Sequence, residues 1–111
     1  MSRSCVLLAA IALPILAGNG AAQEIGRPGE GLASAQRLCA QCHAVRKGQP
    51  RSPNRAAPSF EAIASTPGMT AIALSAALNT SHQSMPNIML EPEERANIIA
   101  YILSLKKPKS R

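Results

Sequence analysis

The sequence of 111 residues predicts a small all-α domain in which three to four helices are joined by long loops. Apolar side chains recur at helical spacing in several short segments, and the clearest of these segments lies near the C-terminus. No stretch alternates apolar and polar residues or concentrates β-branched ones, as a strand would. The nine prolines and seven glycines lie mainly between the helical segments, where they favour turns and irregular loops.

The first 22 residues have the three parts of a secretory signal peptide. Arg3 gives the charged start, residues 5–16 give the apolar stretch, and Gly20-Ala21-Ala22 gives a small-residue cleavage site. The apolar stretch is shorter than the ~20 residues that a membrane-spanning helix needs. We therefore expect a signal peptide over residues 1–22, one exported domain over residues 23–111, a periplasmic location and no stable membrane anchor.

The first helix is predicted over residues 31–42, where Leu32, Ala35 and Leu38 share one face. Residues 44–58 follow it and contain three prolines, one glycine and four basic side chains, which predict a long irregular loop. A loop of this length in a compact domain usually serves a function. Its basic residues are Arg46, Lys47, Arg51 and Arg55.

Two shorter helices are expected in the middle of the chain. Ser59 is a suitable N-cap for a short helix over residues 60–64, which Pro67-Gly68 then terminates. Thr70 precedes a second helix over residues 71–79, in which two leucines lie four residues apart.

The last helix has the strongest signals. Pro92 suits its first turn, the neighbouring glutamates favour the positive N-terminal end of the helix dipole, and Pro108 stops it. Its apolar residues follow the i, i+3, i+4, i+7 rule, so one face is expected to be buried. These residues are Ile98, Tyr101, Ile102 and Leu105.

Cysteine usage singles out one motif. Cys5 lies within the predicted signal peptide, so the exported domain keeps only Cys39 and Cys42. His43 follows directly, which gives C-x-x-C-H, the attachment signature of a c-type haem. On a helix, positions i, i+3 and i+4 lie on one face, so both thiols and the imidazole reach the same flat ligand. The motif predicts that Cys39 and Cys42 form thioethers with one haem and that His43 binds its iron.

The same cysteines have two haem-free interpretations. A thioredoxin-like redox pair belongs in a βαβ unit, and the sequence contains no strand pattern. A closed zinc site needs four ligands, and the exported domain adds only His82, at an unsuitable separation. Haem attachment uses both cysteines and gives a domain with one Phe, one Tyr and no Trp the apolar centre that it lacks.

The second ligand of the iron is expected from the loop between the last two helices, which contains His82, Met85 and Met89. Met85 is the preferred candidate because Pro86 stiffens the backbone beside it. A neutral thioether opposite a histidine also favours ferrous iron and raises the reduction potential. Met89 and Met69 are expected to pack in the core.

Residues 31–105 resemble a small bacterial class I cytochrome c. The resemblance rests on C-x-x-C-H near the N-terminus, on Met85-Pro86 in a late loop, and on residues 94–105, which follow the pattern E-x-x-x-I-x-x-Y-I-x-S-L. It implies the class I cytochrome c fold, with helices and loops wrapped around one covalently attached haem. It also places the ligand on Met85, so that His82 is a polar loop residue and the haem is not bis-histidine.

The resemblance implies roles for residues outside the motif. Gly31 would let the first helix cross closely against Tyr101 of the last. The carbonyl of Pro58 would accept a hydrogen bond from the His43 ring and fix the orientation of that ring. The candidates for binding the haem propionates, by charge alone, are Arg51 and Arg55.

The leading functional hypothesis is a carrier that moves one electron between redox proteins and is not an enzyme. The formal net charge is +6 and falls to +5 when Arg3 leaves with the signal peptide, which permits steering but does not indicate nucleic-acid binding. The expected partners are a terminal oxidase, a reductase or a dehydrogenase, with the chain acting as a monomer or as a subunit of a redox complex. The alternatives are a haem enzyme or sensor whose open sixth site binds peroxide or a diatomic gas, and a haem-free thiol module.

Overall fold

The computed structural model describes residues 25–80 and 84–109. This part of the chain folds into four helices and contains no strand: α1 (Pro28–Leu38), α2 (Phe60–Ser65), α3 (Ala71–Asn79) and α4 (Pro92–Ser104). The predicted all-α class is therefore confirmed. The predicted signal peptide, its cleavage site and His82 lie outside the described residues.

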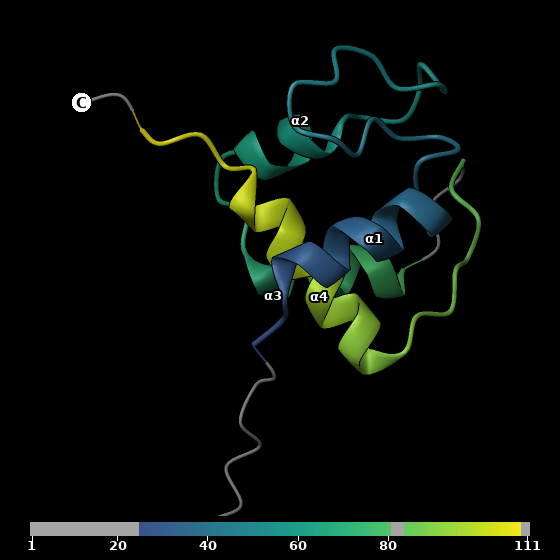
Figure 1. Ribbon diagram of the computed structural model, residues 1–111, viewed down its shortest axis with the longest axis vertical. Helices are drawn as coiled ribbons and strands as arrows, with labels where there is room; N and C mark the ends of the chain where they lie inside the picture. Colours follow the sequence, from purple (N-terminus) through teal and green to yellow (C-terminus); the bar gives the residue numbers. More distant parts are fainter. Residues whose placement is uncertain (1–24, 81–83, 110–111) are drawn as a thin grey trace, which may run out of the picture.

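Helix α4 is the centre of the arrangement, because α1, α2 and α3 all pack against it. Figure 1 shows α1 crossing α4, with α2 near the C-terminal end of α4 and the long loop between α1 and α2 above them. None of the described helices is long and apolar enough to cross a membrane.

The crossing of α1 and α4 depends on Gly31. A Cβ atom at this position would lie 1.9 Å from the backbone oxygen of Asn97 and 2.8 Å from the Cβ of Tyr101. Only a residue without a side chain allows this approach, as expected from the sequence. The start of α1 is fixed on α4 as well, because the backbone N–H of Arg27 donates to Oδ1 of the buried Asn97 at 2.7 Å.

Helix α1 is displaced from its predicted bounds, since it begins at Pro28 and ends at Leu38, before the C-x-x-C-H motif. Pro28 suits the first turn, where its missing N–H costs nothing. At the other end, the carbonyl of Cys39 accepts from the N–H groups of both Cys42 and His43, at 3.1 and 2.9 Å. The prediction that the motif lies on the helix is wrong, because the chain closes a tight turn there and leaves for the loop.

The two middle helices begin where the sequence predicts. The Ser59 side chain accepts from the N–H of Ala62 at 3.1 Å, and the Thr70 side chain accepts from the N–H of Ala73 at 3.2 Å. Each side chain satisfies one N–H that a helix start otherwise leaves unpaired. The predicted break between the helices is also present, since Gly68 adopts a φ of 75°.

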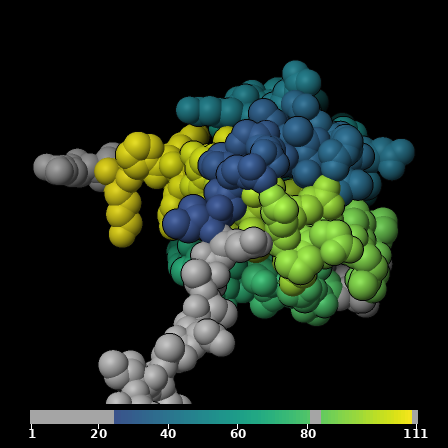
Figure 2. Space-filling model, turned by 60° about the horizontal axis from the view of Figure 1, so that its bottom comes forward, coloured from purple at the N-terminus to yellow at the C-terminus, as the bar shows by residue number. Residues whose placement is uncertain are grey.

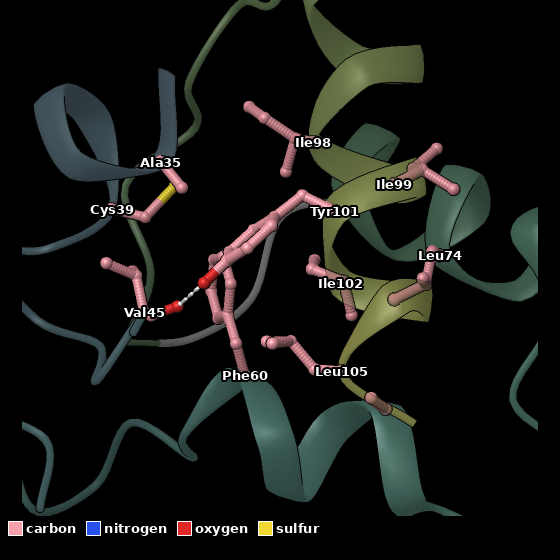
Figure 3. Packing of buried hydrophobic residues seen from close by; sticks show 11 residues of the cluster. Ala35, Cys39, Val45, Phe60, Leu74, Ile98, Ile99, Tyr101, Ile102 and Leu105 are labelled. Atoms are coloured by element: carbon pink, nitrogen blue, oxygen red, sulfur yellow. Dashed lines mark hydrogen bonds between the residues drawn. The ribbon is translucent and has the colours of Figure 1, made fainter. Parts of the chain in front are cut away.

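The hydrophobic core is formed mainly by α4 and by residues from the other three helices that face it (Figure 3). All four apolar residues predicted for the buried face of α4 are in it. The complete cluster is Ala35, Cys39, Val45, Phe60, Ala64, Leu74, Ile98, Ile99, Tyr101, Ile102 and Leu105.

The two methionines assigned to the core behave differently. Met69 is half-buried and packs against the cluster, as predicted. Met89 is 88% exposed, so its assignment to the core is wrong. It lies in a non-helical segment between Ile88 and Leu90, which are both half-buried. The two neighbours of Met89 therefore take the inward positions, and its own side chain faces solvent.

Candidate haem site

The C-x-x-C-H motif lies where α1 gives way to the loop. Cys39 is buried in the core, whereas Cys42 and His43 are half-buried. The His43 Nδ1 atom lies 2.7 Å from the carbonyl oxygen of Pro58. A carbonyl can only accept, so in the neutral ring the proton is on Nδ1 and Nε2 keeps its lone pair. His43 is therefore oriented as a nitrogen ligand for a metal.

The loop after the motif is held by hydrogen bonds from several directions. The N–H of Asn54 donates to the carbonyl of Cys42 at 3.1 Å, and the N–H of Ala44 donates to the Ser52 hydroxyl at 2.9 Å. These bonds attach the residues directly before and after His43 to the loop, so the loop fixes the backbone of His43.

Tyr101 connects this loop to α4. Its hydroxyl donates to the buried carbonyl of Val45, two residues after His43, as Figure 3 shows. The rings of His43 and Phe60 lie 5.5 Å apart, and those of Phe60 and Tyr101 lie 6.3 Å apart. The sequence predicts only a helix-crossing role for Tyr101 and not this bond, because nothing in the local sequence relates residues 56 positions apart.

The electrostatic surroundings of Cys39 suit a neutral sulfur. Burial, and to a lesser extent the charge of Glu94, raises the pKa of the Cys39 thiol to about 11. At neutral pH this thiol is protonated, unlike the low-pKa cysteine of a dithiol redox catalyst. Among the described residues, no group of three or more His, Cys, Asp and Glu side chains is placed to hold a metal ion. The raised pKa of Cys39 therefore does not support a dithiol redox pair.

Met85 and Cys39 line the same pocket. Figure 2 shows residues 84–91 (light green) lying beside α1 and the turn that follows it (blue). The pocket between them is closed by the end of α3, and most of its lining is apolar. The lining residues are Cys39, Ala77, Leu78, Thr80, Met85, Pro86, Asn87, Ile88 and Leu90.

The two arginines predicted to bind the haem propionates lie away from the lining of this pocket. Arg51 and Arg55 are exposed in the loop and do not line this pocket. Within the described residues they form no ion pair, and their role in binding the propionates stays a prediction. The donor types suit a haem: a buried neutral thiol, a half-buried second thiol, an oriented imidazole and a thioether. Cys39 and Met85 line the apolar pocket, whereas Cys42 and His43 do not.

The protein-family model for cytochrome c matches residues 28–106. The chain belongs to the cytochrome c family. It is also similar to cytochrome c-552 of Bradyrhizobium diazoefficiens, with 37% identity over 78 residues, which cover 70% of this chain and 74% of the relative. No solved structure gives a significant match to the chain.

Family membership settles the cofactor. Cytochromes c carry covalently attached haem c with its iron, so this chain is an electron-transfer haem protein with redox partners. The haem-free thiol module is thereby excluded.

Proposed function

We propose that this cytochrome c is an exported, periplasmic carrier that moves one electron at a time between redox proteins. Cys39 and Cys42 would attach the haem, and His43 and Met85 would hold its iron. Two observations carry the proposal: the 2.7 Å hydrogen bond that orients His43, and the pocket that Cys39 and Met85 share. When bound, the haem supplies a one-electron couple between ferric and ferrous iron.

The chain's own residues hold this couple in one geometry. Pro58 keeps a proton on Nδ1 of His43 and so fixes the ring and maintains the basicity of Nε2. Met85 offers a neutral sulfur that favours the ferrous state, and Pro86 restricts the backbone that carries it. His43 and Met85 would both hold the iron, and we therefore propose a carrier and not an enzyme.

The charge distribution supports recognition of acidic partners. The four basic side chains of the loop before α2 are exposed, and the described ion pairs instead involve Arg27 and Arg37. A surface with unpaired positive charge steers an acidic surface, such as one on a terminal oxidase, a reductase or a dehydrogenase. The association rate should therefore fall as salt is raised, and a rate that is independent of salt would exclude steering.

Visible spectroscopy of the exported protein in both oxidation states tests the proposal. Replacing Met85 with Ala should abolish the red absorption band that reports a thioether on ferric iron, and mass measurement should find one haem on the polypeptide. Low-spin iron in both states supports the carrier. High-spin ferric iron in the unaltered protein would support a haem enzyme or sensor with an open sixth site.

A further inference from the structure

Arg95 joins the two ends of the connection that carries Met85. Its Nη1 donates to Oδ1 of Asn79, the last residue of α3, at 3.0 Å. Its Nη2 donates to the carbonyl of Leu90, just before α4, at 3.5 Å. The second bond is the longer and weaker of the two. One guanidinium therefore bridges the point where the chain leaves α3 and the point where it returns to α4.

The bridge is built from fixed parts. The backbone N–H of Arg95 donates to the carbonyl of Glu91 in the first turn of α4, at 2.9 Å. The side-chain amide of Asn79 donates to the carbonyl of Ser75 at 2.9 Å, which turns its oxygen toward Arg95. One acceptor of the guanidinium, Oδ1 of Asn79, is thus held on the backbone of α3. The other, the carbonyl of Leu90, lies two residues before the start of α4.

Arg95 is used differently from the other arginines on this side of the protein. Arg27 and Arg37 each pair with a glutamate of α4, whereas no ion pair within the described residues involves Arg95. Its planar guanidinium instead donates to two neutral oxygens, a geometry that lysine does not reproduce. Leu90, whose carbonyl it holds, lines the same pocket as Met85.

We propose that Arg95 is a positioning residue for Met85: by closing the connection between α3 and α4, it keeps the Met85 sulfur on the iron. The inference rests on the proposed role of Met85 as the axial ligand. Without the bridge, Asn79 and Leu90 lose their common attachment on either side of Met85, and the fraction of molecules in which Met85 has left the iron increases.

Imidazole titration of the ferric protein measures this fraction, because imidazole binds only where Met85 has been released. The loss of a charge-assisted hydrogen bond at a half-exposed position changes an equilibrium by about fivefold. We expect Arg95→Ala to raise the apparent imidazole affinity about fivefold, Asn79→Ala to raise it by a smaller factor, and Arg95→Lys to lie between Arg95→Ala and the unaltered protein.

The matched control is Arg37→Ala, which removes another arginine bound to α4 without touching the connection. It should leave the imidazole affinity unchanged, even if it lowers the denaturation midpoint. An unaltered affinity in Arg95→Ala, or an equal rise in Arg37→Ala, would overturn the role of Arg95. If Arg95→Ala does not take up haem, Asn79→Ala decides in its place, and an unaltered affinity there has the same meaning.

The two proposals fail in distinguishable ways. If the unaltered ferric protein lacks the red thioether band, Met85 is not the ligand and both proposals are wrong. If the band is present and none of the bridge variants alters the imidazole affinity, only the role of Arg95 is wrong.

Discussion

The two sides of the haem site are held by different means. On the His43 side, a long irregular loop is tied down by many separate hydrogen bonds to the motif, to α2 and to α4. On the Met85 side, the side-chain bonds among the described residues that join the two ends of the connection between α3 and α4 come from Arg95. Irregular backbone is therefore not the same as loosely held backbone in this molecule.

The His43 side and the Met85 side should respond differently to the loss of a single contact. Where many contacts fix one geometry, the loss of one leaves the rest in place, and the position of His43 changes little. Where one side chain fixes the ends of a segment, its loss acts on the whole segment. We therefore expect the Met85–iron bond to be the first part of the site to open when the protein is destabilised locally.

The largest effect is expected from a substitution that disrupts the crossing of α1 and α4, which supports both sides of the site. Gly31→Ala places a Cβ 1.9 Å from the backbone oxygen of Asn97, so the helices must separate. We expect a loss of about 3 kcal/mol or more in the free energy of unfolding, measured by denaturant titration. The control is Gly29→Ala in the same helix, where nothing lies within 4 Å of the new Cβ and helix propensity predicts a small gain.

An intermediate effect is expected when the His43 side loses its strongest link to α4. Tyr101→Phe removes the donor to the Val45 carbonyl and leaves that buried acceptor unpaired, which costs about 1–3 kcal/mol. The imidazole affinity of the ferric protein should stay the same, because the other bonds still hold His43 and the Met85 side is untouched. A rise as large as in Arg95→Ala would contradict the comparison.

The same variant has a pH signature. Burial, first, and the charge of Glu61, second, raise the pKa of Tyr101 above its ordinary value. The fold thus favours the neutral phenol, and this contribution is fully present below the unfolded pKa of about 10 and is lost as the pH rises through the folded pKa. Denaturation midpoints measured between pH 9 and 12 should fall less steeply in Tyr101→Phe than in the unaltered protein.

Local sequence was sufficient for part of this picture. Ser59 and Thr70 cap α2 and α3 because a side-chain oxygen next to a helix start acts on its own neighbours. The periodicity of Ile98, Tyr101 and Ile102 likewise identified the buried face of α4. The C-x-x-C-H motif was sufficient to identify the cofactor, because haem attachment requires those residue types at that spacing.

The errors arose where distant parts of the chain decide the local structure. Helix α1 ends at Leu38 because the N–H of Ala40 donates to the carbonyl of Ala35, five residues back, at 3.0 Å, which breaks the i→i−4 pattern and which no helical periodicity reveals. Met89 is expected in the core because Leu90 follows it, but its side chain is exposed while those of Ile88 and Leu90 are half-buried. The bridges made by Tyr101 and Arg95 were not predicted, because each depends on the packing of α4 against a separate loop.

The smallest effect is expected from one of the many contacts on the His43 side. In Glu61→Ala, the N–H of Gly48 loses its carboxylate acceptor, which lies at 3.0 Å. Gly48 is exposed, so water replaces the lost acceptor, and the free energy of unfolding should fall by less than about 1 kcal/mol. The imidazole affinity and the red thioether band should not change.

Glu61→Ala nevertheless has an effect that links the loop to Tyr101. The charge of Glu61 is one of the causes that raise the pKa of Tyr101, so its removal lowers that pKa toward the ordinary value. The alkaline loss of stability begins near the unfolded pKa of about 10 in both proteins, but it should be smaller and end at a lower pH in Glu61→Ala, and this shift should vanish when Tyr101→Phe is combined with it. A shift that persists in the double variant would mean that another group titrates, and would remove Tyr101 as the alkaline weak point of the His43 side.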